Sequence, residues 1–293
     1  MDVNPRLSMN QATIKYAPFA EAVRASTDAG IQSMGVWREP VCEVGLRQAA
    51  KIFNDSGLRF SSYCRGGFFT DCQGPSRRSA IDDNRRAIEE TATLAAVGAP
   101  GSRPVLSLVA GGIPEASRDI VGARQRVRDA IEELYLFAQS AGVILAIEPL
   151  HPMFASDRCV INTIGQALDL AEDFDPSVVG LMIDTFHVWW DPLLFSSISN
   201  TGGQGRIACY QVSDWKTPLF SDVLLSRHYP GQGVIDLGGI TEAVLQTGYS
   251  GDIEVEIFNA DIWADTPDHV VNNVIRAFNS TLLIPGGLLK GER

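Results

Sequence analysis

Four polar side chains stand at the ends of apolar runs, where a folded chain ordinarily buries hydrocarbon. Glu148 lies in LAIEPLHP, Asp184 in LMIDTFHVWW, Gln211 in CYQVSDW and Glu256 in IEVEIFN. A carboxylate in such a run loses much of its hydration unless a cation or hydrogen bonds replace the water. Three carboxylates and an amide on four successive runs therefore indicate a metal ion, and with it an enzyme.

The chemistry of these donors predicts which metal they would hold. All four offer oxygen ligands, a set that suits Mn²⁺ or Mg²⁺ better than Zn²⁺ or copper. We expect one divalent ion, Mn²⁺ first, with Mg²⁺ or Co²⁺ as alternatives. The competing interpretation is that the four residues are strand-end caps or ion-pair partners.

Two histidines accompany the carboxylates at the same spacing. His151 follows Glu148 by three residues, and His187 follows Asp184 by three. Either could be a ligand, a residue that orients a ligand, or a general base, because imidazole titrates near neutrality. The alternative is a hydrogen-bonded structural histidine beside a strand end.

Further residues could contact a substrate. Arg227 precedes a short GQG loop, and Arg38 stands beside Trp37 after a predicted strand. All five tryptophans, including Trp37 and Trp189, follow predicted strand ends, where they could stack on a sugar or aromatic ring or simply pack. We assign His187 to substrate binding together with these residues.

The elements that must position these residues alternate along the whole chain. Short β-branched or apolar runs predict eight strands: 7–11, 33–37, 59–64, 105–110, 144–149, 180–185, 207–213 and 253–258. Apolar residues at helical spacing predict helices over 19–29, 44–56, 79–96, 124–141, 164–173, 237–247 and 268–282. The stretch after the sixth strand predicts a short helix followed by a glycine-rich loop.

This alternation favours a single α/β domain over residues 1–293, a (β/α)8 TIM barrel, in which site residues come from the C-terminal ends of strands. A doubly wound open sheet would alternate similarly. It would be expected to carry a glycine-rich nucleotide loop after the first strand, and NQATIKYAPF has none.

Composition excludes several classes of partner. The formal charge of −11 over 293 residues disfavours nucleic acid and anionic membranes. Five cysteines (Cys42, Cys64, Cys72, Cys159 and Cys209) show no CxxC spacing, which is typical of reduced thiols in the cytoplasm. The N-terminus has no apolar signal region, and no apolar run approaches the roughly 18 residues of a membrane span. We expect a cytoplasmic protein.

At EPLHP, DTFH, QVSDW and GQGVID the sequence resembles the xylose isomerase-like family of sugar isomerases and epimerases. The resemblance implies a barrel with one divalent metal, held by Glu148, Asp184, Gln211 and Glu256. Gln211 stands where the family more commonly has His, although some hydroxypyruvate isomerase-like members also have Gln. His151 stands where the family's typical fifth strand has Asn.

His151 and the aromatic segment DTFHVWWDP are also similar to the metal-bearing catalytic subunit of bacterial C-glycoside deglycosidases. That resemblance implies a sugar first oxidised to its 3-keto form by another enzyme. It also implies a small β-rich partner subunit and cleavage of the C–C bond to an aromatic aglycone. An oligomer is expected with either family.

Both resemblances imply the same first step. A base, Glu148, Glu256 or His151, removes a proton next to a metal-polarised carbonyl. Expulsion of an aryl group then makes a C–C lyase of 3-oxo-C-glycosides, our first interpretation. If the proton is instead returned to a neighbouring carbon or to the opposite face, the enzyme is an isomerase or epimerase. This is the alternative interpretation. A dehydratase would expel hydroxide instead, and a non-catalytic sugar-binding barrel is the remaining class. An endonuclease is disfavoured because it would need more histidines and a basic face.

Overall fold

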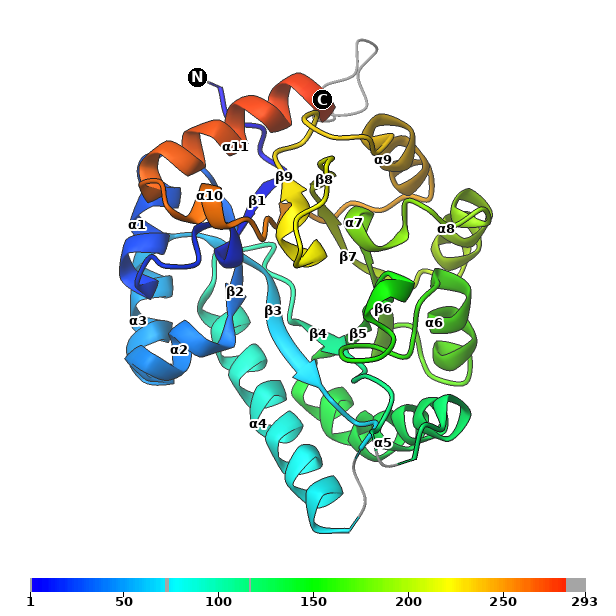
Figure 1. The fold of residues 1–293 in the computed structure, drawn as a ribbon. Helices are drawn as coiled ribbons and strands as arrows, with labels where there is room; N and C mark the ends of the chain where they lie inside the picture. Colours follow the sequence, from blue (N-terminus) through cyan, green and yellow to red (C-terminus); the bar gives the residue numbers. More distant parts are fainter. Residues whose placement is uncertain (1, 72–73, 116, 283–293) are drawn as a thin grey trace.

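The predicted barrel is confirmed. A computed structural model of the protein describes residues 2–71, 74–115 and 117–282, so that Cys72 lies outside the described residues. Within them, eight parallel strands close in the order β1-β10-β7-β6-β5-β4-β3-β2 (Figure 1). The other four cysteines are free thiols, as expected. No helix in the described ranges is long and apolar enough to cross a membrane.

The barrel strands are β1 (Leu7–Asn10), β2 (Ser33–Trp37), β3 (Arg59–Gly67), β4 (Val105–Val109), β5 (Ile144–Ile147), β6 (Val179–Asp184), β7 (Ile207–Val212) and β10 (Ile253–Val255). The helices are α1 (Phe19–Asp28), α2 (Arg38–Val44), α3 (Leu46–Ser56), α4 (Pro75–Val97), α5 (Ile120–Ala141), α6 (Ile164–Ala171), α7 (Thr185–Val188), α8 (Leu194–Gly203), α9 (Leu237–Gln246), α10 (Ala260–Trp263) and α11 (Pro267–Leu282). Three short 3₁₀ turns are η1 (Gln11–Ile14), η2 (Pro152–Phe154) and η3 (Val223–Ser226).

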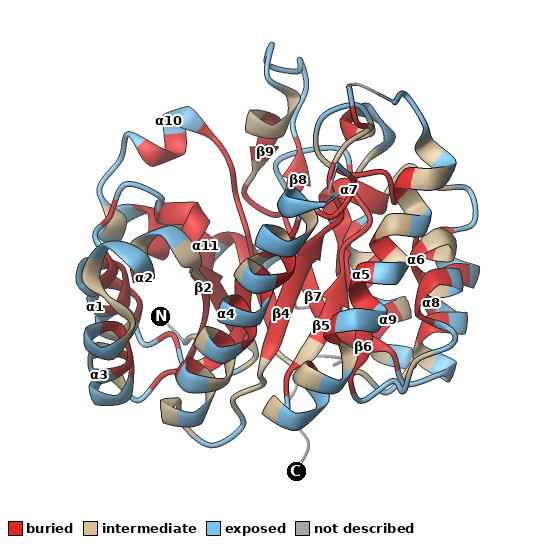
Figure 2. Cartoon of the chain, turned by 90° about the horizontal axis from the view of Figure 1, so that it is seen from below, coloured by how far each residue is buried: buried red, intermediate tan, exposed pale blue. Residues whose placement is uncertain are grey.

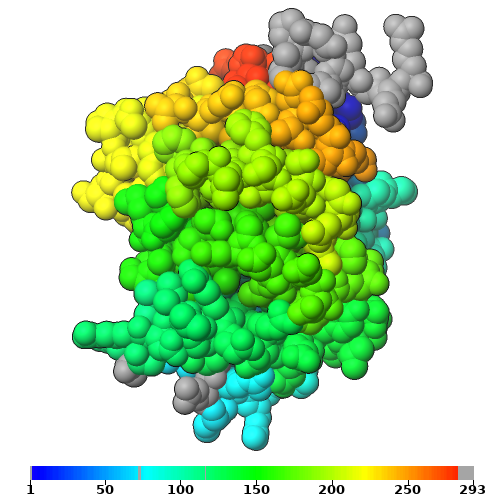
Figure 3. All heavy atoms as spheres, turned by 90° about the vertical axis from the view of Figure 1, so that its right-hand side faces the viewer, coloured from blue at the N-terminus to red at the C-terminus, as the bar shows by residue number. Residues whose placement is uncertain are grey.

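The helices form the outer layer in chain order. In Figure 3 the colours of one outer face pass from cyan through green to orange, as expected when each helix packs beside the next. Contacts follow the same order, with α6 against α8 and α8 against α9. Figure 2 shows the strands buried and the helices exposed on their outward faces, which is the layering of a TIM barrel.

Strand alternation explains how the barrel interior changes from apolar to polar. Side chains two residues apart on a strand point to the same face. Two residues before Glu148, Asp184 and Gln211 in the sequence, the chain carries Ala146, Met182 and Cys209. These three residues form one buried apolar cluster with Val105 and Ala208. By this alternation, Glu148 directly after β5, Asp184 on β6 and Gln211 on β7 point to the same side of the sheet as that cluster.

The register brings three polar residues to one level. Asp184 on β6 pairs with Gln211 on β7, and Gln211 pairs with Glu254 on β10. A small antiparallel sheet lies outside the barrel order, formed by β8 (Asp214–Trp215) and β9 (Arg227–His228). This small sheet places Arg227 at the mouth of the barrel.

Candidate metal centre and active site

A cavity of about 1050 Å³ opens at the C-terminal end of the strands. Of the site residues expected from the sequence, Glu148, His187, Arg227, Glu256 and Trp37 line it. Glu148 follows β5, His187 lies on α7 directly after β6, Glu256 follows β10 and Arg227 lies on β9. All four side chains are buried. The structure thus brings together most of the polar residues that the strand ends indicated.

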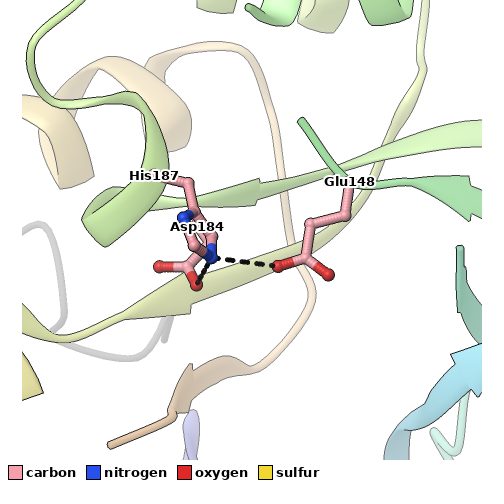
Figure 4. Close-up of side chains that lie close together, drawn as sticks. All are labelled: Glu148, Asp184 and His187. Carbon is pink, nitrogen blue, oxygen red and sulfur yellow. Dashed lines mark ion pairs between the residues drawn. The ribbon is translucent and has the colours of Figure 1, made fainter. Parts of the chain in front are cut away.

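Glu148, Asp184 and His187 form a compact cluster that could hold a metal ion, because one ligand atom from each lies within 4.8 Å of the others (Figure 4). His187 Nε2 is 3.9 Å from both Glu148 Oε1 and Asp184 Oδ2. The local sequence explains this geometry: Asp184 caps α7 by accepting a hydrogen bond from the Phe186 N–H at 2.9 Å. The helical turn then returns His187 to the side of Asp184.

Arg227 supplies the positive charge that these acids need. Its Nη1 donates to Asp184 Oδ2 at 2.6 Å and lies 3.3 Å from Glu256 Oε2. Its Nη2 lies 3.0 Å from His187 Nε2. A guanidinium only donates hydrogen bonds, so Arg227 Nη2 can approach His187 only as a donor. The other ring nitrogen, Nδ1, lies 3.3 Å from the backbone N of His151. The sequence indicated a substrate contact for Arg227, and the structure adds its ion pairs with two carboxylates.

Burial sets the protonation behaviour of the cluster. Burial, together with the charge of Asp184, raises the pKa of Glu148 to about 7. Burial also raises the pKa of Glu256 well above its ordinary value, and Arg227 opposes part of this shift. The pKa of His187 is held well below its ordinary value by burial and by Arg227. The site therefore combines a neutral imidazole with one carboxyl group, that of Glu148, that can exchange protons near neutral pH.

Gln211 is held by a second buried carboxylate that the sequence analysis did not single out. Glu254 is fully buried and accepts hydrogen bonds from Gln211 Nε2 at 2.7 Å and Asn10 Nδ2 at 2.6 Å. The hydroxyls of Ser61 and Ser62 also donate to it. The Glu254 oxygen accepts this bond, so Gln211 turns its NH₂ toward Glu254. Its Oε1 is left buried without a partner.

Five expected site residues are absent from the cavity lining: Asp184 and Gln211, which belong to the buried polar cluster, and three that have their contacts elsewhere. Arg38 pairs with Asp83 at 2.6 Å and Glu90 at 2.8 Å on α4 and does not line the cavity, so we leave it out of the proposed site. His151 also lies outside the lining, because η2 begins directly after it and its Nδ1 accepts from the Met153 N–H. Trp189 is also absent from the lining and packs on Trp215 instead, with ring centroids 5.5 Å apart.

Several lining residues were not found from the sequence. Ser107 donates to Glu148 Oε2 at 2.9 Å, and Arg65 and Phe258 line the cavity. Arg65 had a usable signal, because it directly follows the predicted end of the third strand at Cys64. Ser107 had none, since a serine inside a strand is common without function.

Comparison with known proteins is consistent with this geometry. The family model described as xylose isomerase-like TIM barrel matches residues 23–279. A crystal structure of a Sinorhizobium meliloti 1021 protein is 43% identical with a TM-score of 0.88, covering 94% of this chain and 98% of that one.

Two curated relatives are similar over about half of this chain. Inosose isomerase of Bacillus subtilis (strain 168) is 29% identical over 145 residues, 49% of this chain and 50% of the relative. The 3-dehydroshikimate dehydratase of Pseudomonas aeruginosa PAO1 is 38% identical over 149 residues, 48% of this chain and 22% of the relative. The chain thus spans half or less of the length of these relatives.

Proposed function

Because the chain belongs to the xylose isomerase-like TIM barrel family, we propose that it is a divalent-metal-dependent isomerase or epimerase. It would move a proton next to the carbonyl of a keto-sugar or a keto-cyclitol. One observation carries this proposal: Glu148 and Glu256 are both buried, both line one cavity, and both have a raised pKa. The relatives named for inosose isomerisation and dehydroshikimate dehydration support carbonyl chemistry of this kind.

The residues at the mouth fit a metal ion. Glu148, Asp184, Gln211 and Glu256 would hold it, and the unpartnered buried Oε1 of Gln211 supplies the amide oxygen that such a site needs. This set of oxygen donors favours Mn²⁺, with Mg²⁺ or Co²⁺ as alternatives. When bound, the ion would supply the positive charge that polarises the substrate carbonyl.

The protein's own groups would then move the proton. Glu148 would accept a proton from the substrate and return it. Ser107 holds its Oε2, which leaves Oε1 as the oxygen on the side of His187. Glu256 would act as the acid or base on the opposite face of the sugar. Epimerisation requires one such group on each face. Arg227 and neutral His187 would bind substrate oxygens beside them.

Elimination is the second candidate, because aromatic rings line the same cavity. Trp37, Phe68, Phe258 and Trp263 would suit the aglycone of a 3-oxo-C-glycoside, whose C–C bond a lyase would cleave with a small β-rich partner subunit. His151 does not line the cavity, so the lining gives no support to His151 as the base of a lyase. For this reason we place the lyase after the isomerase.

Turnover in deuterated water separates the two candidates. The Mn²⁺-loaded protein is incubated with ketoses and keto-cyclitols in one series and with a 3-oxo aryl C-glucoside in another. Deuterium next to the carbonyl together with an isomeric product supports the isomerase, and release of the aglycone supports the lyase. Absence of both deuterium exchange and aglycone release would contradict the proposed function.

His151→Ala serves as the matched variant for these two series. An isomerase that uses the glutamate pair should lose little activity in this variant. A lyase that depends on His151 as its base should lose most of its activity.

A further inference from the structure

Arg65 brings into the cavity a positive charge that forms no ion pair with any described carboxylate. It lies near the C-terminal end of β3 and lines the cavity that Glu148 and Glu256 share. The other lining arginines are paired: Arg227 with Asp184 at 2.6 Å, and Arg158 with Asp157 at 3.3 Å. Among the residues that the structure describes, no carboxylate lies within ion-pair distance of Arg65.

Two aromatic rings hold the Arg65 guanidinium instead. Its central carbon is 5.7 Å from the centroid of Trp37 and 4.9 Å from the centroid of Phe68. Phe68 adopts a φ of 60°, a left-handed conformation that is uncommon for a bulky residue and is found most often at functional sites. The Trp37 indole is fixed in turn by its N–H, which donates to Asn10 Oδ1 at 2.8 Å.

This arrangement fits an oxyanion better than any other ligand. A guanidinium presents a planar set of donors that matches phosphate and carboxylate oxygens, and aromatic flanks reduce the freedom it must lose on binding. Lys15 is the other unpaired lining cation, but it is exposed and stacks on Trp263 at 4.6 Å. Arg65 is half-buried, and its charge lowers the pKa of Glu148, so both groups act within one cavity.

We propose that Arg65, held between Trp37 and Phe68, forms an oxyanion subsite that selects substrates carrying a phosphate or a carboxylate. The carbonyl end of such a substrate would lie at the buried acids, while its anionic group would bind at Arg65. The identity of the substrate as a keto-sugar or keto-cyclitol rests on the proposed function, whereas the subsite itself can be tested without turnover.

Titration calorimetry with two matched pairs of non-reactive ligands tests the subsite. Ribitol 5-phosphate is compared with ribitol, and shikimate with its methyl ester, on the Mn²⁺-loaded protein. None of these ligands carries a ketone, so binding is measured apart from chemistry. We expect the anionic member of at least one pair to bind about 10- to 100-fold more tightly than its neutral partner, the usual contribution of charge-assisted hydrogen bonds. The pair that shows the preference identifies phosphate or carboxylate as the anion.

Arg65→Met should abolish that preference, and Lys15→Met, which removes a charge from the same mouth, should keep it. Circular dichroism checks folding, and Arg65→Gln replaces the methionine variant if the latter does not fold. A wild type without the preference, an Arg65 variant that keeps it, or an equal loss in Lys15→Met would overturn the subsite. Failure of the proposed function looks different: the ligands would still be discriminated, but no carbonyl substrate would exchange deuterium.

Discussion

Replacing Glu254 with methionine should weaken metal binding while replacing it with glutamine should not. In the wild type, the Glu254 carboxylate accepts from Gln211 Nε2 at 2.7 Å, which leaves Gln211 Oε1 free for the ion. Methionine removes the acceptor, so the amide can rotate and donate to the ionised acids beside it. Asp184 is the nearest candidate, because it pairs with Gln211 in the sheet register.

The expected magnitude follows from that competing bond. A hydrogen bond to a charged acceptor contributes about 1.5–3 kcal/mol and must break before the amide oxygen can bind the ion. The apparent dissociation constant for Mn²⁺ should therefore rise about 10- to 100-fold, the range usual for residues that orient metal ligands. Titration of the chelator-treated protein with Mn²⁺ measures it directly.

Glu254→Gln is the matched control because it removes the charge but keeps an acceptor. The NH₂ of the introduced amide can face Ser61 and Ser62, whose hydroxyls can accept as well as donate. The oxygen of that amide can still face Gln211 and Asn10. Affinity should stay within about threefold of the wild type. Equal weakening in both variants would show that the charge of Glu254 matters rather than its geometry. Unchanged affinity in a folded Glu254→Met would refute the reasoning.

Three further outcomes are expected. Glu148→Gln and Asp184→Asn should each abolish metal-dependent turnover with an unchanged circular dichroism spectrum, and full activity in either would remove these residues from the site. The metal-free protein should be less stable to urea at pH 8 than at pH 5, by about 3 kcal/mol from Glu148 alone. The folded pKa of this residue, about 7, exceeds its ordinary value of 4.5. Its stabilising contribution is therefore complete below pH 4.5 and is lost as pH rises through 7. Glu148→Gln should remove the part of this dependence that comes from Glu148 and leave the part that comes from Glu256, and an unchanged pH profile in that variant would contradict the assignment. Arg38→Met should lower the free energy of unfolding by about 1–3 kcal/mol, because it breaks two partly buried ion pairs, yet leave kcat/KM unchanged. A loss of kcat/KM without a loss of stability would return Arg38 to the substrate-binding residues.

Local sequence pattern was enough to predict the barrel and the strands that carry its acids. All eight predicted runs overlap a barrel strand, because each is a short β-branched segment bounded by helical spacing. The largest boundary errors lie at the third strand, which extends to Gly67, and at the last, which ends at Val255 before Glu256. In both cases hydrogen bonding to the neighbouring strand, rather than residue type, decides where the strand ends.

Side-chain direction could not be predicted in the same way. Arg38 and Arg65 each follow a strand, yet α2 begins at Arg38 and carries it to the acids of α4, whereas Arg65 remains on β3 beside the cavity. Glu254 was missed because its importance comes from Gln211, 43 residues away, and sequence spacing carries no trace of that pairing.

The small β8–β9 sheet makes the charge balance of the barrel depend on a segment outside it. Arg227 lies on β9, and its guanidinium touches two of the buried acids directly. Local opening of the β8–β9 segment would withdraw the Arg227 guanidinium. The carboxylates that it contacts would then be ionised in a low-dielectric interior without a counter-charge. Opening is therefore linked thermodynamically to proton uptake, so the amide protons of residues 214–228 should be more protected from exchange at pH 8 than at pH 5 in the metal-free protein. A peripheral two-stranded element is thus tied to the centre of the molecule by electrostatics as well as by packing.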